Sequence, residues 1–564
     1  MKKLLYVTML LVALGLIVSG CIEPSGDVKP EPEAAVTILV QGSPIDGANG
    51  IIFDSDDRLH IASIVGREIV VMDPETGEML DRIGPDVGVE GPDDLIFGPD
   101  GSLYWTSIMT GEVGRLSPDG VCTSQFVAPG VNPITVSDDG RLFVALDFMG
   151  DALYELDSDL IDPPRLIAED LGFLNGMDFG PDGFLYGPIW TKGEVVRVDV
   201  DNGTITTVAD GFGVPAAVKF DSEGGLHVVD YTNGEILRVD AETGEKEVIA
   251  RLPSGLDNLA FDSHDRLFVS HGPDGAIFEV LADGTTRTVS SGGMIAAGGG
   301  VAVLPRSDGE SVFVADLFTL REFDGLTGEE RSIERHYIGM PGITSPETAS
   351  PDGDNLVLSS VFSNTVQVWS PETREVLEEY TDFAVPINAI RFQGDLIVVE
   401  RGFEAGACRV TQASDEGRVI LADSADGLAL PVGLAATDDD LWVSDWATGM
   451  VQQIIADGEP LAEPIPVAAN LSAPEGLAVA PDGSLLVVET GVGRLSSIDL
   501  GTGEVRTIAE GLLLGAEGIE GYTPTWIFNG VAVGPSGAIY ITGDIANVLY
   551  RNRSPKPDYV REGA

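Results

Sequence analysis

A unit of about 43 residues recurs twelve times along the chain, and this repeat constrains the fold more than any other feature. Residues 214–250 show the unit clearly: four short runs of alternating β-branched and polar residues, separated by Gly-containing turns. The residues that enter the first run of successive units are Asn49, Asp93, Asn132, Asn175, Ala216, Asp257, Gly299, Ser345, Asn388, Val432, Glu475 and Asn529. Each unit therefore predicts one small sheet of four strands.

A lone four-stranded sheet exposes both faces, and radial stacking against neighbouring sheets buries them. Units of this length are typical of β-propeller blades, which close into rings of about 4–8. We therefore predict an all-β chain with two tandem six-bladed β-propellers, and seven plus five blades is the alternative. The Gly-rich stretch 291–300 separates the halves. The predicted domains are a first propeller at 36–294, a second at 295–551 and a tail at 552–564, and residues 36–40 could supply an outer strand that closes a ring.

The first 35 residues carry a targeting pattern. Lys2 and Lys3 precede an apolar run at 4–18, and Val-Ser-Gly-Cys follows at 18–21. This pattern predicts a signal peptide at 1–20, lipidation of Cys21 and a proline-rich linker at 21–35. An uncleaved membrane anchor is the alternative. Either one predicts an exported body, attached at the outer face of the cytoplasmic membrane or at the cell surface.

The net charge of the chain argues against nucleic acid and anionic membrane surfaces as binding partners. Its 32 Lys and Arg residues face 91 Asp and Glu residues, which gives a formal net charge of −59. Nucleic acid and anionic membrane surfaces would be repelled over the whole molecule. A hydrophobic content of 43% is nevertheless sufficient for packed cores. After Cys21 only Cys122 and Cys408 remain, and the sequence leaves open whether they form a disulfide or stay free.

The repeat also predicts where polar side chains gather. The innermost strand of each blade starts near one mouth of the central channel, so the entering residues should form a ring around each mouth. In the first ring, Asn49, Asp93, Asn132, Asn175 and Asp257 offer carboxylate or amide oxygens. Such oxygens suit a hard cation such as Ca²⁺ or a polyol. The alternative is that they cap turns through their own backbone, and we favour that role for the second ring, from Gly299 onward.

Two segments carry a resemblance to a known family. Glu90-Gly91-Pro92, together with residues 95–116, resembles the opening blade of the senescence marker protein/gluconolactonase family, and residues 175–183 resemble a later blade. The resemblance covers mainly residues 42–294. It implies a six-bladed propeller with one divalent metal at the channel mouth, usually Ca²⁺ or Zn²⁺, and many members hydrolyse sugar lactones. It places metal ligands at Glu90 and Asn175 and a substrate-facing residue at Asn132.

The family's ligating aspartate falls on Ala216, or on Asp257 after a shift of one blade. In the second half, residues 485–495 are similar to strictosidine-synthase-like relatives, and the Pro-Asp-Gly turns are shared with NHL-repeat propellers. Glu400 and Glu489 each end a Val-Val-Glu run. They are candidates for channel-lining acids, with solvated turn residues as the more common outcome.

Two hypotheses of function follow. The first is a lipid-anchored surface module whose mouths bind a protein, a glycan or a small molecule, with a divalent metal, Ca²⁺ or another, in the first propeller. The second is a metal-dependent hydrolase of the lactonase type, in which the ion polarises the lactone carbonyl and activates a water. A lyase acting through the same mouth is a third option. We favour the binding module because a fold alone does not confer activity.

Overall fold

The computed structural model describes residues 36–336, 341–403, 406–414, 416–519 and 527–553. The predicted signal peptide, the lipidation site Cys21, the linker at 21–35 and the tail beyond residue 553 lie outside these residues. Within the described ranges, no helix has both the length and the apolar character needed to cross a membrane. The helical elements seen there are single 3-10 turns: η1 Pro85–Val87, η2 Trp190–Lys192, η3 Gly272–Asp274, η4 Ser424–Asp426 and η5 Thr490–Val492.

The described chain forms twelve four-stranded antiparallel sheets, which confirms the all-β prediction and the twelve repeat units. The strands of the first six sheets are β2 Ile51–Phe53, β3 Leu59–Ser63, β4 Glu68–Met72, β5 Met79–Ile83; β6 Pro92–Phe97, β7 Leu103–Ser107, β8 Glu112–Leu116, β9 Cys122–Phe126; β10 Val131–Val136, β11 Leu142–Leu146, β12 Ala152–Leu156, β13 Arg165–Glu169; β14 Asp178–Phe179, β15 Leu185–Ile189, β16 Glu194–Asp199, β17 Thr204–Ala209; β18 Pro215–Phe220, β19 Leu226–Asp230, β20 Glu235–Val239, β21 Lys246–Arg251; and β22 Leu256–Phe261, β23 Leu267–His271, β24 Ala276–Val280, β25 Thr286–Ser290.

The other six sheets contain β26 Val301–Arg306, β27 Gly309–Asp316, β28 Thr319–Asp324, β29 Glu330–Arg335; β30 Thr348–Asp352, β31 Asn355–Ser360, β32 Thr365–Ser370, β33 Glu375–Tyr380; β34 Pro386–Phe392, β35 Asp395–Glu400, β36 Arg409–Ser414, β37 Gly417–Asp423; β38 Pro431–Ala436, β39 Leu441–Asp445, β40 Met450–Ala456, β41 Glu459–Ala468; β42 Pro474–Val479, β43 Leu485–Glu489, β44 Arg494–Ile498, β45 Val505–Glu510; and β46 Val531–Val533, β47 Ala538–Gly543, β48 Val548–Arg553 together with β1 Val36–Gln41.

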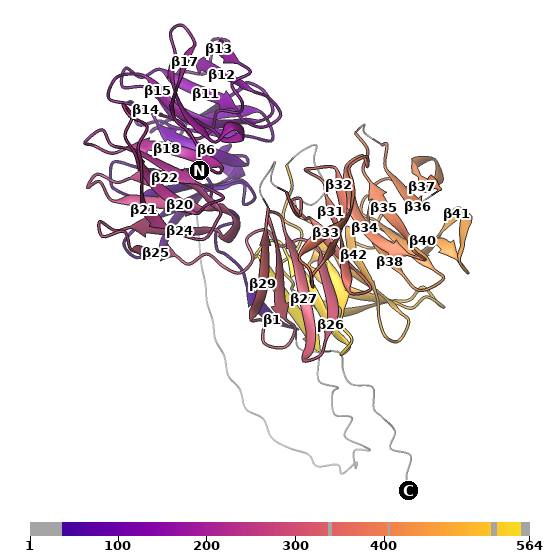
Figure 1. Cartoon of the computed structure of the whole chain (residues 1–564). Coiled ribbons are helices and arrows are strands. Elements are labelled where there is room, and N and C mark those ends of the chain that lie inside the picture. The colour runs from indigo at the N-terminus through magenta and orange to yellow at the C-terminus, as the bar shows by residue number, and fades with distance from the viewer. Residues whose placement is uncertain (1–35, 337–340, 404–405, 415, 520–526, 554–564) are drawn as a thin grey trace, which may run out of the picture.

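Contacts between the first strands group these sheets into two rings. In the first half, β2, β6, β10, β14, β18 and β22 contact one another in turn, and β22 also contacts β2. In the second half, β26, β30, β34, β38, β42 and β46 form the same kind of closed cycle. Each ring thus holds six sheets, and Figure 1 shows them as an indigo-to-magenta body and a rose-to-yellow body. We refer to them as the first and second ring.

Strand β1 joins the two ends of the described chain. It pairs with β48 in antiparallel register, from Val36 opposite Asn552 to Gln41 opposite Val548, in a sheet of order β1-β48-β47-β46. The last repeat unit has three strands of its own, and β1 supplies the fourth. This confirms the prediction that residues 36–40 supply an outer strand that closes a ring, and the ring that the strand closes is the second one. Along the chain, the whole first ring lies between β1 and β26.

Local sequence explains why each sheet forms. Along β19 and β20, apolar residues pack into the cores on both sides of the sheet, among them Val228 and Ile236. The Thr-Asn-Gly turn between these strands ends at Gly234, which has a φ of +60°. A Cβ at that position would lie 2.0 Å from the carbonyl oxygen of Leu252, so only glycine fits the turn. The two remaining cysteines, Cys122 and Cys408, are both free thiols.

Candidate functional site

A cavity of about 160 Å³ lies at the mouth of the first ring. Five of the six residues predicted to surround this mouth line it: Asn49, Asp93, Asn132, Asn175 and Asp257. The sixth, Ala216, is 1% exposed and packs in the core between two sheets instead. Five oxygen-bearing side chains from five different sheets therefore converge on one cavity, because each precedes or begins the first strand of its sheet.

A second tier of residues surrounds the same cavity. It consists of the residue that follows the second strand of each sheet: Ile64, Ile108, Asp147, Trp190, Tyr231 and Gly272. Asp147 is the acid among them, and the sequence analysis missed it. The sequence does contain a feature that could have identified Asp147, which directly follows the apolar run of β11. In later units, Glu400 and Glu489 are likewise acids at the end of the second-strand run.

Two carboxylates of the site carry oxygens without hydrogen bonds. Asn49 Nδ2 donates to Asp93 Oδ1 over 2.7 Å, and Asn132 Nδ2 donates to Asp147 Oδ2 over 3.1 Å. Within the described structure, Asp93 Oδ2 and Asp147 Oδ1 are buried and have no partner. The two residues are only 3% and 6% exposed. A buried carboxylate oxygen without a partner is costly, so these two atoms are candidate ligands for a cation.

The raised pKa values of the acids at this site also favour a bound cation. Burial, and then the nearby negative charges of Asp257 and Asp147, raise the pKa of Asp93 well above its ordinary value. Burial likewise raises the pKa of Asp147 to about 8 and that of Asp257 to about 7, and neighbouring carboxylates add to both shifts. These carboxylates repel one another, and none of the described residues that line the cavity is a Lys or Arg that could neutralise them.

One acid next to this cluster is structural. Asp94 accepts hydrogen bonds from the backbone N–H of Ile134 at 3.0 Å and from Asn258 Nδ2 at 3.3 Å, which links three sheets of the ring. Gly50 leaves room for it, because a Cβ there would lie 2.5 Å from Asp94 Oδ1.

Asn175 has a partly local role as well, since its Oδ1 accepts from the backbone N–H of Gly176 at 2.7 Å. The turn-capping alternative therefore holds in part for Asn175.

Glu90 is placed apart from the other predicted ligands. Its carboxylate accepts two hydrogen bonds from Arg67, at 2.5 Å to Nε and 2.8 Å to Nη2. Arg67 also donates to the carbonyl oxygen of Glu517 in the second ring. Glu90 does not line the cavity, and the structure brings Asn49, Asp93, Asn132, Asn175 and Asp257 together without it.

The mouth of the second ring contains an acid in place of the predicted serine. In the first ring, the backbone N–H of Gly50 donates to the carbonyl oxygen of Asp93, and in the second ring Gly300 donates equivalently to Glu347 over 2.8 Å. Glu347, and not Ser345, therefore enters the first strand of that unit. Its side chain is 5% exposed, its Oε2 has no partner within the described structure, and burial raises its pKa to about 8.

Glu400 and Glu489 are neither channel-lining acids nor solvated turn residues. Both are 0% exposed. Glu400 accepts from the backbone N–H of Ala384 and from Arg409, and Glu489 accepts in the same way from Ser472 and Arg494. Each carboxylate thus fastens the loop that precedes the first strand of its own sheet, because a buried glutamate can hold a backbone donor and an arginine at once.

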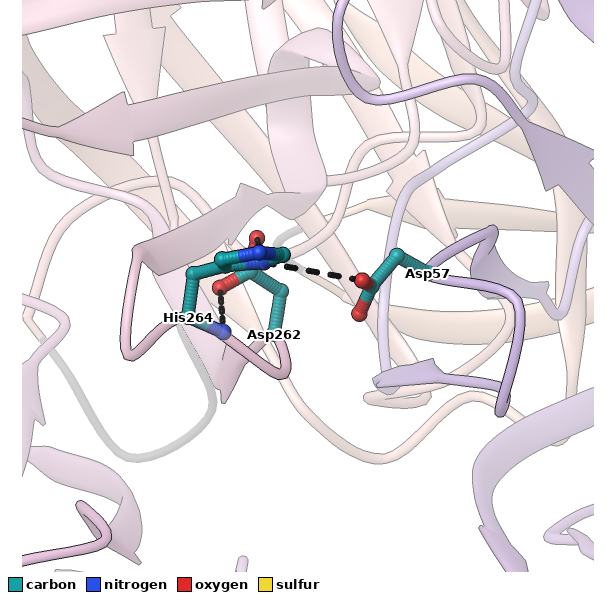
Figure 2. A group of neighbouring side chains, drawn as sticks. All are labelled: Asp57, Asp262 and His264. Atoms are coloured by element: carbon teal, nitrogen blue, oxygen red, sulfur yellow. Dashed lines mark hydrogen bonds and ion pairs between the residues drawn. The ribbon is translucent and has the colours of Figure 1, made fainter.

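A further Asp–His group lies at the turns between first and second strands. Figure 2 shows Asp57, Asp262 and His264, with His264 Nδ1 at 3.6 Å from Asp57 Oδ2. Asp57 also accepts from the backbone N–H and the hydroxyl of Ser263, and Asp265 accepts from Ser222 in the same two ways. The repeated Asp–Ser contact joins neighbouring sheets, so this group is explained as a structural link between blades.

Comparison with known proteins agrees with the resemblance described for the first half. Residues 90–294 match the family model of the SMP-30/Gluconolactonase/LRE-like region. No curated protein matches the chain by sequence.

Many solved structures are similar to this chain, and three of them are described here. A virginiamycin B lyase from Staphylococcus aureus is 15% identical over 50% of this chain and 96% of that one, with a TM-score of 0.37. A gluconolactonase from Xanthomonas campestris is 18% identical over 43% and 88%, with a TM-score of 0.34. The extracellular domain of a hybrid two-component system from B. thetaiotaomicron is 12% identical over 93% and 83%, with a TM-score of 0.31. The predicted resemblance is thus confirmed for the segment that begins at Glu90, where the first ring matches the SMP-30/gluconolactonase/LRE-like region.

Proposed function

We propose that the protein is an exported ligand-binding module that holds a divalent cation, Ca²⁺, at the mouth of the first ring. The observation that carries the proposal is the pair of buried, unpartnered oxygens, Asp93 Oδ2 and Asp147 Oδ1, in a cavity that also contains Asp257. A divalent cation would supply both missing contacts and neutralise the carboxylates.

The chemistry of the donors favours Ca²⁺ among divalent ions. Asp93, Asp147 and Asp257 offer carboxylate oxygens, and Asn49, Asn132 and Asn175 offer amide oxygens. Among the described residues, no histidine or cysteine lines the cavity. Ca²⁺ takes about 6–8 oxygen ligands in flexible geometry, whereas Zn²⁺ prefers nitrogen and sulfur. The ion would take its ligands from among these six residues.

The ligand of the module is a small molecule in this proposal. The cavity is lined by residues of both rings and has a volume of about 160 Å³, which suits a small molecule better than a folded protein partner. The targeting pattern at the N-terminus supports export and attachment through a lipid on Cys21.

A second candidate function is hydrolysis of a lactone, which the family match over residues 90–294 favours. A bound cation would supply Lewis-acid polarisation of the lactone carbonyl. A carboxylate of the Asp93, Asp147 and Asp257 group that is not engaged by the cation would take the proton from the attacking water. Asn132 and Asn175 would orient the ring oxygens of the substrate.

Calorimetric titration with Ca²⁺ tests the proposal. The protein should lack residues 1–20 and carry Cys21→Ser so that it is soluble. We expect one binding site in this parent, and its loss in the double variant Asp93→Asn, Asp147→Asn. Glu90→Gln is the matched control, because Glu90 is bound to Arg67 outside the cavity and its loss should leave affinity within about twofold. Absence of Ca²⁺ binding by the parent, or binding that depends on Glu90 alone, would overturn this site.

A further inference from the structure

Three Asn-x-Ser/Thr motifs occur in the chain, at Asn202, Asn470 and Asn552. In exported proteins this motif is the acceptor for N-linked glycosylation, in which the side-chain amide nitrogen of the asparagine receives a saccharide. A saccharide is bulky and hydrophilic, so a modified asparagine must lie on the surface of the fold. The three motifs are equivalent in sequence, and the structure separates them.

Asn202 is exposed in the turn between β16 and β17 of the first ring. Its Oδ1 accepts from the backbone N–H of Thr204 at 2.9 Å, and its Nδ2 donates to Asp199 Oδ2 at 2.6 Å. These two bonds hold the amide in one orientation at the surface. Within the described structure they use one of the two hydrogens on Nδ2, so the other is open to replacement by a saccharide.

Asn470 is exposed in the loop between β41 and β42 of the second ring. The residues after it fasten this loop. The backbone N–H of Leu471 donates to the carbonyl oxygen of Gly449 at 3.0 Å, and that of Ser472 donates to Glu489 Oε2 at 2.9 Å. The loop is thus held in place by its backbone while the side chain of Asn470 remains at the surface.

Asn552 is the opposite case. It lies within β48, between Val36 of β1 and Ile539 of β47, and is 0% exposed. Its two amide atoms are buried and have no hydrogen-bond partner within the described structure. A fully buried amide cannot carry a saccharide unless the pairing of β48 is disrupted, so the folded second ring excludes modification of Asn552.

Both accessible sites lie next to the outermost strand of a sheet. Asn202 precedes β17 and Asn470 follows β41, and within the described sheets each of these strands has a hydrogen-bonded neighbour on one side only. Each strand also exposes an isoleucine, Ile205 at 41% and Ile465 at 50%. An exposed strand edge with apolar side chains can pair with another chain, and a hydrated saccharide beside it would hinder that contact.

We propose that Asn202 and Asn470 carry N-linked saccharides in the exported protein. In the transfer, a bond forms between the asparagine Nδ2 and the anomeric carbon of a saccharide, and the bond from that carbon to the phosphate of a lipid-linked donor breaks. The phosphate leaves with the electron pair of that bond, and the proton lost from Nδ2 passes to a base of the transferase. Thr204 and Ser472 supply the hydroxyl groups that the transferase recognises. The inference goes beyond the proposed function and shares with it only the export of the chain.

Peptide mapping by mass spectrometry, on the full chain isolated from the producing cells, tests the inference. We expect the mass of a saccharide on the peptides that contain Asn202 and Asn470, and none on the peptide that contains Asn552. Thr204→Ala and Ser472→Ala should each abolish the modification of their own site, whereas Thr204→Ser should retain it. None of these positions lines the cation cavity, so Ca²⁺ binding should be unchanged in the three variants.

Asn233 is the matched control within the same chain. It is exposed in an Asn-Gly turn, as Asn202 is, and its Nδ2 likewise donates to a carboxylate in the preceding strand, Asp230 Oδ2, at 2.9 Å. Glu235 stands two residues after Asn233, where a Ser or Thr would be required. The peptide that contains Asn233 should therefore stay unmodified.

Absence of a saccharide from both sites, in a protein that has lost residues 1–20, overturns the inference. A saccharide on one site alone overturns the assignment of the other. Modification that persists in Thr204→Ala and Ser472→Ala, or that also occurs at Asn233, shows attachment without regard to the motif and overturns the inference as well. A protein found in the cytoplasm with residues 1–20 intact overturns the export that both proposals include.

Discussion

Asn49 donates a hydrogen bond of 2.7 Å to Oδ1 of Asp93 and so joins the first strands of two neighbouring sheets, while Oδ2 of the same carboxylate stays buried without a partner within the described chain. The bond orients the carboxylate, and the free oxygen defines where a cation would bind. The negative charge of Asp93 is unfavourable for the stability of the metal-free fold, and the same charge is necessary for a metal site.

Replacing Asp93 should therefore separate stability from binding. We expect Asp93→Asn to stabilise the metal-free protein by roughly 1 kcal/mol, because it removes a buried charge from a repulsive cluster. The parent should instead gain about 2.7 kcal/mol from Ca²⁺ at a hundred times its Kd, and the variant should gain little. Chemical denaturation in EDTA and in excess Ca²⁺ measures both effects. Asp56→Asn, at an exposed position, is the control; a variant that is less stable than the parent in EDTA would contradict the expectation.

Glu347 should give the second ring a pH dependence of its own. Burial raises the pKa of this carboxyl from 4.5 to about 8, so the folded state holds the proton more tightly than the unfolded state between these values. The contribution of Glu347 to the free energy of unfolding is therefore fully present below pH 4.5 and is lost as the pH rises through about 8, by roughly 5 kcal/mol in total.

Glu347→Gln should remove this fall, so that the variant is about as stable as the parent near pH 4.5 and more stable near pH 9. Urea denaturation across this range measures the difference between the two proteins. Glu372→Gln, at an exposed position of the same ring, should follow the parent at every pH. Parallel stability curves for the parent and Glu347→Gln would show that the carboxyl is not held protonated.

Strand β1 should stabilise the second ring and not the first. Val40 is 1% exposed and packs with Val303, Phe323 and Tyr540 of the second ring. Val40→Asp would place an unpaired charge in that core, and we expect a loss of roughly 3 kcal/mol or more. Hydrogen exchange should show reduced protection in β48, the partner of β1, with β2–β5 unchanged. Ile38→Asp in the same strand is the control, since Ile38 is 52% exposed, and loss of protection in β2–β5 would contradict the pairing.

The targeting pattern at residues 1–21 gives a prediction about location. Lipidation of Cys21 would attach the protein to a membrane, so Cys21→Ser should move it from the membrane fraction to the soluble fraction of the producing cells. Cys122→Ser, which leaves the N-terminus unaltered, should not change the distribution. Membrane attachment that persists in Cys21→Ser would favour the alternative of an uncleaved anchor.

The sequence by itself determined the repeating elements. The alternation of apolar and polar residues, and turns such as Thr-Asn-Gly ending at Gly234, are local signals, and they predicted twelve four-stranded sheets. They also placed Asn49, Asp93, Asn132, Asn175 and Asp257 at one mouth, because these residues occupy equivalent positions of successive units. Equivalence within the repeat placed these five residues, but not Ala216, which packs in a core, or Ser345, whose place is taken by Glu347.

Only the tertiary structure decided what depends on contacts between distant residues. The sequence predicted a ring-closing strand at residues 36–40, but its pairing with the end of the chain, from Val36 opposite Asn552, is a contact that no local pattern encodes. Asp147 reaches the cavity from the end of a second strand, and Asn132 holds it there from the first strand of the same sheet. Asp316, Leu317 and Phe318 line the cavity because a second ring packs on the mouth of the first. The repeat encodes each sheet, whereas ring closure and the contact between rings decide which side chains share one cavity.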